Sequence, residues 1–194
     1  MTTAPTPGAA DEVPPAPPCA MVIFGAAGDL TKRLVVPSLY NLVTARRLPD
    51  AFQLVGVDLA EKTSEDWRAG LTAMIERMAA EKGGEFEAPS IDKAAWDWLG
   101  ERMTYVQGDL NDPHAYRRLG QHLAGLDKTK GTAGNHLFYL AVADRFFATA
   151  VAGLGAAGLT TETEGQWRRV VIEKPFGHDL PSAKALNADI LKTL

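Results

Sequence analysis

The stretch AMVIFGAAGDLTKRLVVPSLYNL, residues 20–42, decides the fold that we predict for this chain. Its first five residues are apolar and rich in types that favour β structure, which is typical of a buried strand. Gly25 and Gly28 then enclose two alanines, and a helical period begins at Asp29. The leucines of this helix are predicted to share one face: Leu30, Leu34, Leu39 and Leu42.

A strand that enters a helix through a tight glycine turn is a ready site for an anion. Backbone N–H groups and the positive end of the helix dipole are expected to point at whatever enters the turn. Small residues fill such a turn because a phosphate must approach the backbone closely. The sequence therefore indicates a phosphate-binding turn between residues 25 and 30.

Composition limits the class of protein. The chain has 194 residues, of which 46% are hydrophobic and 23% are charged, and its net charge is −4. These values predict a soluble chain of one domain or slightly more, with no nucleic-acid or membrane partner. The single cysteine, Cys19, excludes an intrachain disulfide, and we expect it to be a small core residue. We find neither a secretory signal nor an apolar run of about 20 residues, so we expect a cytoplasmic protein.

The first 18 residues, MTTAPTPGAADEVPPAPP, differ in composition from the rest. Proline and alanine dominate, and few side chains are able to offset the entropy cost of ordering. We predict a disordered tail over residues 1–18, with a partner-binding polyproline II segment as the alternative, and a dinucleotide-binding domain over residues 19–194.

The remainder alternates between predicted strands and helices. An alternation of this kind predicts a parallel sheet covered by helices on both faces, an α/β doubly wound, Rossmann-like fold. The expected strands are residues 20–24, 52–57, 103–107, 136–142 and 168–173. The expected helices are residues 29–42, 63–80, 91–101, 112–128, 145–157 and 179–194, with loops over 81–90 and 129–134.

Ligands of doubly wound folds bind beyond the carboxyl ends of the strands. Asp58 ends the second strand, 30 residues after Gly28, where an acid accepts a hydrogen bond from a ribose 2′-hydroxyl. Such an acid repels a 2′-phosphate, which favours NAD over NADP, although Lys32 or Lys62 could still pair with that phosphate. The alternatives are an aspartate that caps a helix and, since Thr31 replaces the third glycine of the usual pattern, a turn without a ligand.

Lys174 is the best chemical candidate of the chain, and it lies between Glu173 and Pro175, where the fifth strand leaves the sheet. An ammonium at the rim of a nucleotide cleft is suited to binding a phosphate or to orienting a hydroxyl. The alternative is a surface lysine paired with Glu173. The bond before Pro175 is a candidate for the cis form. His178 follows, but the histidines show no metal-ligand spacing, and we predict no metal site.

Four segments resemble the N-terminal domain of the glucose-6-phosphate dehydrogenase family: FGAAGDLTKR, YVQGDLNDPHAY, FYLAVADRFF and VVIEKPFGHDL. The resemblance covers residues 20–194 and implies oxidation of glucose 6-phosphate to 6-phosphogluconolactone with NADP or NAD, a step of the pentose phosphate pathway. It implies that a run of residues cradles the pyrophosphate: Gly25, Ala26, Ala27, Gly28, Asp29 and Leu30. It also implies that Asp109 and Leu110 line the adenosine side, that Lys174 touches both sugar phosphate and cofactor, and that Pro175 is cis.

The chain departs from the family pattern at four points. Its 194 residues contain no RIDHYLGKE-type segment, which supplies the catalytic histidine, so we expect a cofactor domain that is inactive alone and lacks the C-terminal substrate domain. Leu34 replaces a basic residue that helps to hold the substrate, Leu59 replaces the arginine that meets a 2′-phosphate, and Asp144 replaces a proline near the nicotinamide. Asp58 and Leu59 together lean towards NAD.

Two other functions stay open from the sequence. One is a second type of sugar oxidoreductase with an EKP turn after its fifth strand. The other is a non-catalytic dinucleotide-binding module. A homo-oligomer is expected only for a full-length enzyme.

Overall fold

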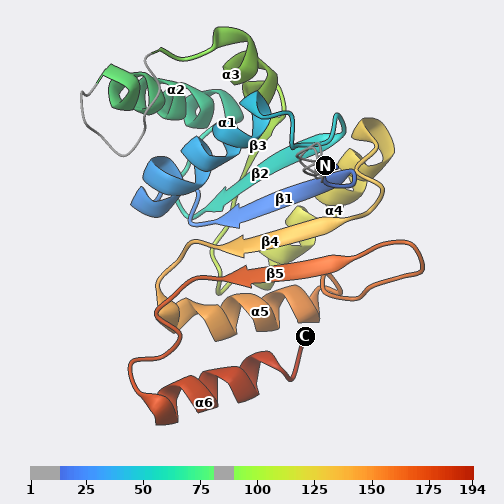
Figure 1. Ribbon diagram of the computed structural model, residues 1–194. Helices are drawn as coiled ribbons and strands as arrows, with labels where there is room; N and C mark the ends of the chain where they lie inside the picture. Colours follow the sequence, from blue (N-terminus) through green and yellow to red (C-terminus); the bar gives the residue numbers. More distant parts are fainter. Residues whose placement is uncertain (1–13, 81–89) are drawn as a thin grey trace, which may run out of the picture.

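A single parallel sheet forms the centre of the computed structural model, which describes residues 14–80 and 90–194. Its five strands lie in the order β3-β2-β1-β4-β5 (Figure 1). Their bounds are β1 Cys19–Phe24, β2 Phe52–Asp58, β3 Met103–Gln107, β4 His136–Leu140 and β5 Arg168–Ile172. The chain moves outward from β1 to β3 and then returns to place β4 on the other side of β1. The predicted doubly wound fold is therefore confirmed, and its switch point lies between β1 and β4.

Helices cover both faces of this sheet (Figure 1). One face carries η1 Thr31–Val35, α1 Val36–Thr44, α2 Ser64–Ala80 and α3 Lys93–Gly100. The other face carries α4 Pro113–Lys130, η2 Asp144–Phe146, α5 Phe147–Ala156 and α6 Leu180–Ile190. No helix among the described residues is long and apolar enough to cross a membrane.

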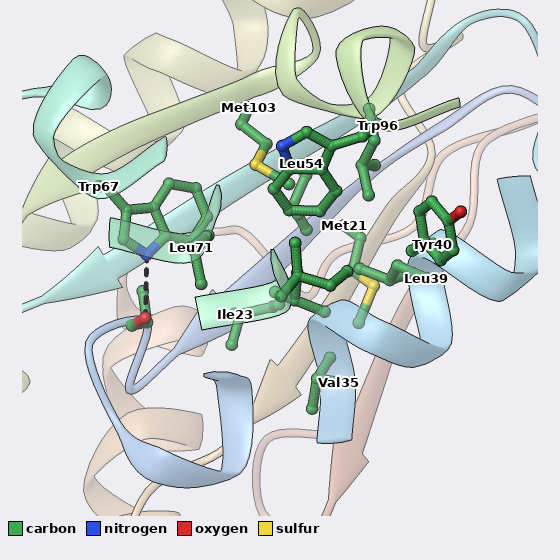
Figure 2. Close-up of a cluster of buried hydrophobic side chains, with 14 of the residues drawn as sticks. Met21, Ile23, Val35, Leu39, Tyr40, Leu54, Trp67, Leu71, Trp96 and Met103 are labelled. Carbon is green, nitrogen blue, oxygen red and sulfur yellow. Dashed lines mark hydrogen bonds between the residues drawn. The ribbon is translucent and has the colours of Figure 1, made fainter. Parts of the chain in front are cut away.

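The central strand β1 is buried at every position, because both of its faces are covered by helices. Met21 and Ile23 join the core beneath α1, α2 and α3, whereas Val22 and Phe24 join the core beneath α4 and α5. Figure 2 shows the first of these cores, in which Trp67 and Trp96 close over the strands. This two-sided burial explains why the strand is a continuous apolar run rather than an alternating one.

The first helix begins at Asp29, as predicted, but its predicted apolar face is only half right: Leu30 and Leu39 contact the core, whereas Leu34 and Leu42 do not. Leu34 is 48% exposed and Leu42 is 40% exposed, whereas Val35, Val36 and other residues take the buried positions. The cause is the π-helical segment Thr31–Val35, whose wider turn shifts the phase of every later residue. The predicted face therefore fails at Leu34 and Leu42.

Several predicted boundaries also move. The helix α4 runs through Lys130 and ends at Gly131, which has φ 70°. The loop predicted for residues 129–134 is therefore shorter than expected. The strand β4 stops at Leu140, and α6 stops at Ile190 rather than at the chain end. The predicted loop over 81–90 lies almost wholly outside the described residues. The same holds for residues 1–13 of the predicted tail, while Ala16 N–H donates to Arg47 O at 3.2 Å.

Candidate functional site

The glycine turn after β1 is pressed against the segment that follows β4. Gly25 has φ 87°, and a Cβ on it would lie 2.2 Å from the carbonyl oxygen of Ala141. Only glycine satisfies both conditions, because other residues avoid positive φ and carry that Cβ. This close approach brings the turn and the end of β4 to one edge of the sheet.

Two side chains from the helices η1 and α2 donate hydrogen bonds to carbonyls of the turn. Trp67 Nε1 donates to the carbonyl of Ala26 at 2.9 Å, a hydrogen bond drawn in Figure 2. Thr31 Oγ1 donates to the carbonyl of Gly25 at 2.8 Å, and Thr31 is fully buried. Thr31 stands where the third glycine of the usual dinucleotide pattern would be, and here it closes the turn with a hydrogen bond.

The amides of the turn point inward, contrary to the expectation that they face an anion. Gly25 and Ala26 N–H both donate to Val57 O, at 3.0 and 3.2 Å, and Gly28 N–H donates to Gly25 O at 2.9 Å. Ala27 N–H donates to Asp58 Oδ2 at 2.8 Å. The donors that remain for a phosphate are the first helical amides, from residues 29 to 31, because the first N–H groups of a helix have no partner within the helix.

An open cleft of about 450 Å³ lies beside this turn. It is lined by residues that follow β1, β2, β3 and β4, which confirms that the ends of four strands meet at one site. The lining residues are Gly25, Val57, Asp58, Leu59, Gly108, Asp109, Leu110, Asn111, Ala141, Val142, Ala143, Arg145 and Phe146. The cleft straddles the switch point, where doubly wound folds bind ligands.

Two tyrosines at this edge support the polar rim. Tyr105 Oη donates to Ala60 O at 2.6 Å and Tyr116 Oη donates to Leu110 O at 2.8 Å. Burial, assisted by the charges of Asp58 and Asp109 respectively, raises the pKa of each tyrosine to about 12. Both hydroxyls therefore stay protonated and act as fixed donors that position the loops carrying the two aspartates.

Asp109 is held in a local turn. Its Oδ1 accepts hydrogen bonds from the backbone N–H of Asn111 at 2.8 Å and from Asn111 Nδ2 at 2.9 Å. Asp109 lines the cleft, and its Oδ1 is already paired with Asn111, whereas a carboxylate has a second oxygen that is able to accept from a ligand hydroxyl.

Four of the residues predicted for cofactor binding line the cleft by geometry, namely Gly25, Asp58, Asp109 and Leu110. The others lie elsewhere: Ala26 is buried, Leu30 packs against the core beneath α1, and Asp29 pairs with Arg33 at 3.6 Å on the surface. The backbone of Ala27, Gly28 and Asp29 is still part of the turn.

Lys174 lies one strand away from the cleft. It follows β5, it is exposed, and the peptide bond between it and Pro175 is cis, as predicted. Within the described residues no ion pair joins Lys174 to Glu173, the alternative considered from the sequence. Instead Tyr139 Oη donates to Glu173 Oε1, and burial followed by that hydrogen bond raises the pKa of Tyr139 to about 12. Lys174 therefore lies outside the residues that line the cleft, on a turn in which the neighbouring acid, Glu173, is bound by Tyr139.

Sequence reasoning did not assign Arg145 and Phe146 to the site. The guanidinium carbon of Arg145 lies 4.7 Å from the centre of the Phe146 ring, and both residues line the cleft. Arg145 is the cation among the lining residues. A signal was present, since both residues follow the fourth strand at the switch point, but they were assigned only to a helix.

Comparison with known proteins identifies the family. The model of "Glucose-6-phosphate dehydrogenase, NAD binding domain" matches residues 22–194. The chain belongs to the glucose-6-phosphate dehydrogenase family. Glucose-6-phosphate 1-dehydrogenase 2 of Mycobacterium tuberculosis is 38% identical over 170 residues, which are 88% of this chain and 32% of that relative. Glucose-6-phosphate 1-dehydrogenase of Bacillus subtilis is 38% identical over 174 residues, 90% of this chain and 32% of that relative.

Solved structures agree with this family. The crystal structure of glucose-6-phosphate 1-dehydrogenase from Mycobacterium avium matches with a TM-score of 0.76 and 30% identity, over 92% of this chain and 34% of that one. A glucose-6-phosphate dehydrogenase in complex with glucose 6-phosphate matches with a TM-score of 0.77 and 25% identity, over 94% of this chain and 35% of that one. The chain thus spans about a third of the length of the curated relatives it matches.

A nicotinamide dinucleotide is the cofactor that membership of this glucose-6-phosphate dehydrogenase domain supports. The residues present fit such a group. The turn leaves no room for a side chain at Gly25, and the first amides of the helix are available to donate to a phosphate. Two residues with carboxylates, Asp58 and Asp109, line the cleft and are suited to accept from hydroxyl groups.

Proposed function

We propose that this chain binds NAD in preference to NADP and serves as the cofactor half of an oxidation of glucose 6-phosphate to 6-phosphogluconolactone. The observation that carries the proposal is the cleft at the switch point, with Asp58 at the end of β2 facing it beside the glycine turn. In this arrangement the pyrophosphate lies over the first helical amides and the adenosine enters the cleft, with Asp109 and Leu110 beside it.

The preference for NAD rests on two neighbouring residues. The carboxylate of Asp58 is suited to accept from a ribose hydroxyl and repels a 2′-phosphate. Leu59, which is 67% exposed on the cleft rim, offers an apolar surface and no positive charge. Arg145 is the specific observation that favours the second candidate, NADP, because its guanidinium lies in the same cleft.

The sugar phosphate is assigned to the rim beyond β5. Lys174 would supply an ammonium there for a phosphate or sugar oxygen, and the family resemblance implies that it would touch the cofactor as well. Leu34 offers no charge at the point where the family pattern has a basic residue, so we expect weak binding of glucose 6-phosphate by this chain. The base of the reaction is assigned to no residue of the chain, and turnover by it alone is expected to be slow or absent. The oligomeric state and the cytoplasmic location stay predictions.

Titration calorimetry with NAD, NADP and glucose 6-phosphate tests the proposal. We expect NAD to bind at least tenfold more tightly than NADP, a difference of about 1.4 kcal/mol. In Leu59→Arg the ratio should move towards NADP by about tenfold, whereas Leu180→Arg, at an exposed position on α6, should leave it unchanged. Equal affinities in the wild type would favour NADP through Arg145, and failure to bind either dinucleotide would overturn the proposal. Robust reduction of NAD with glucose 6-phosphate by this chain would contradict the expected inactivity.

A further inference from the structure

The end of β2 holds most of the glycine turn through hydrogen bonds. Val57 accepts two amides of the turn through its carbonyl, and Asp58 accepts a third, from Ala27, through its side chain. The fourth amide, of Gly28, closes onto Gly25. Three of these four bonds use backbone acceptors, so among these four amides Ala27 N–H is the one that a side chain accepts. Trp67 and Thr31 hold the carbonyls of the turn, and Asp58 holds this amide.

The segment that carries Asp58 is itself fixed. The carbonyl of Ala60 accepts from Tyr105 Oη at 2.6 Å, and Gly108 N–H donates to the carbonyl of Asp58 at 2.9 Å. The strands β2 and β3 pair in register up to Asp58 and Gln107. The carboxylate of Asp58 therefore reaches the turn from a rigid base, which is what a residue that positions another segment requires.

The two carboxylate oxygens of Asp58 are used unequally. Oδ2 lies 2.8 Å from Ala27 N, whereas Oδ1 lies 3.4 Å from Ala60 N, close to the limit of a hydrogen bond. One oxygen is thus committed to the turn and the other keeps its capacity for a ligand hydroxyl.

We propose that Asp58 is a positioning residue for the phosphate-binding turn: its hydrogen bond to Ala27 holds the turn in the shape that a dinucleotide needs, independently of its negative charge. This inference rests on the proposed function. It assigns Asp58 two separable roles, acceptance of the Ala27 amide, which needs only an oxygen, and discrimination against a 2′-phosphate, which needs the charge.

Two substitutions separate these roles. Asp58→Asn keeps an oxygen for Ala27 N–H and removes the charge, whereas Asp58→Ala removes both. The matched control is Glu61→Gln, which removes a nearby exposed carboxylate that makes no hydrogen bond to the turn. Thermal melts establish that each variant is folded. If Asp58→Ala does not fold, Asp58→Asn decides alone: a loss of Ala27 amide protection of about tenfold or more in Asp58→Asn would overturn the claim that this hydrogen bond needs only an oxygen.

The direct measurement is hydrogen exchange of the Ala27 amide by NMR without ligand. We expect protection to fall about tenfold in Asp58→Ala, because this variant leaves the Ala27 amide without an acceptor. Protection should stay within about threefold of wild type in Asp58→Asn and Glu61→Gln, because both variants keep an oxygen for this amide. Unchanged protection in Asp58→Ala would overturn the inference even if NAD binds as proposed.

The second measurement is calorimetry with NAD, NADP and inorganic pyrophosphate. Removal of a carboxylate by itself favours an anion, so weaker pyrophosphate binding by Asp58→Ala than by Asp58→Asn is the signature of a lost turn shape. NAD affinity should fall about tenfold in Asp58→Ala and less in Asp58→Asn, and Asp58→Asn should gain affinity for NADP. Pyrophosphate binding in Asp58→Ala equal to or tighter than in Asp58→Asn would overturn the positioning role. A wild type that binds pyrophosphate but neither dinucleotide would overturn the proposed function, and with it the dinucleotide part of this inference.

Discussion

The two edges of the same sheet use polar residues in opposite ways. At the carboxyl edge, Asp58 and Asp109 line an open cleft and each keeps an oxygen for a ligand. At the amino edge, Asn135 and His136 at the start of β4 are buried, with exposed fractions of 5% and 3%. Asn135 donates to Pro18 O at 2.9 Å and accepts from Trp167 N–H at 3.0 Å. The polar side chains of Asn135 and His136 at the amino edge therefore bind other parts of the protein, whereas those of Asp58 and Asp109 at the carboxyl edge also line a cleft open to a ligand.

The contrast shows why polarity alone does not locate a site. His136 Nε2 lies 3.1 Å from Asp127 Oδ1, and Asp127 also accepts from Thr132 Oγ1 and from Gly134 N–H. An acid, a histidine and a hydroxyl thus meet in space, yet they tie the end of α4 to the start of β4. Hydrogen bonds of this kind stabilise the fold, since an unpaired buried polar group is costly. Within the described residues, the second ring nitrogen of His136, Nδ1, is buried without a hydrogen-bond partner.

The largest effect is expected at the glycine turn. In Gly25→Ala the new Cβ meets the Ala141 carbonyl and the backbone keeps a positive φ, so we expect a loss of about 3 kcal/mol or more in the free energy of unfolding and loss of dinucleotide binding. Urea unfolding and calorimetry measure the two effects. In Gly125→Ala, on α4 where a Cβ meets nothing, stability should rise by about 0.5 to 1 kcal/mol. Similar behaviour of the two variants would refute the close approach at Gly25.

The amino edge should respond in stability and not in binding. Asn135→Ala leaves the Pro18 carbonyl and the Trp167 amide without their partner, so we expect a loss of about 2 to 4 kcal/mol. The affinity for NAD should stay within twofold of wild type when measured well below the melting temperature. Asn111→Ala, on the exposed cleft rim, should show the reverse: a stability change under about 0.5 kcal/mol and weaker NAD binding. If both variants lost affinity alike, the division between the two edges would fail.

A smaller effect is expected on lowering the pH. Burial, followed by the charge of Arg168, lowers the pKa of His136 despite the opposing Asp127, and burial lowers the pKa of His122. A histidine with a lowered pKa in the folded state takes up its proton more readily when unfolded, so stability falls as the pH drops below the ordinary value of about 6.5. Urea titrations at pH 7.5 and 5.5 measure this loss.

The variant His136→Gln measures how much His136, at the amino edge, contributes to that pH dependence. Glutamine keeps a donor for Asp127 and does not titrate, so the loss of stability between the two pH values should shrink. Glu162, which faces Arg168, is the other charged group near this site. An undiminished pH dependence in His136→Gln would assign the acid sensitivity to His122 and the carboxylates.

The smallest effect belongs to an exposed ion pair beside the turn. Asp29 and Arg33 approach to 3.6 Å with both side chains largely exposed. We expect Arg33→Ala to change the free energy of unfolding by less than about 0.5 kcal/mol, because water and salt screen such pairs. A loss above about 1 kcal/mol in the free energy of unfolding at about 0.15 M salt would show that this exposed pair stabilises the fold as the buried hydrogen bonds of the amino edge do. The contrast between the two edges of the sheet would then be weaker.

Much of the fold was predictable because short local patterns of apolar residues indicate which segments are buried. The run from Ala20 to Phe24 predicts a strand covered on both faces, and the alternation of strands and helices predicts the doubly wound sheet. The same topology brought Asp58 and Asp109 to one edge without any side-chain detail. The buried face of the first helix was not predictable from a 3.6-residue period, because the π-helical turn at Thr31–Val35 arises from the packing around it.

The sequence by itself determined the family, the sheet, the strand ends and the residue types available for a dinucleotide. Only the tertiary structure decided how those residues are used: that the amides of the glycine turn point inward, that Thr31 replaces a glycine by closing the turn, and that Arg145 enters the cleft while Lys174 stays one strand away. The physical reason is that hydrogen-bond direction depends on atoms from distant segments. The side chain of Asp58, 31 residues from Ala27, determines where that amide points in the glycine turn.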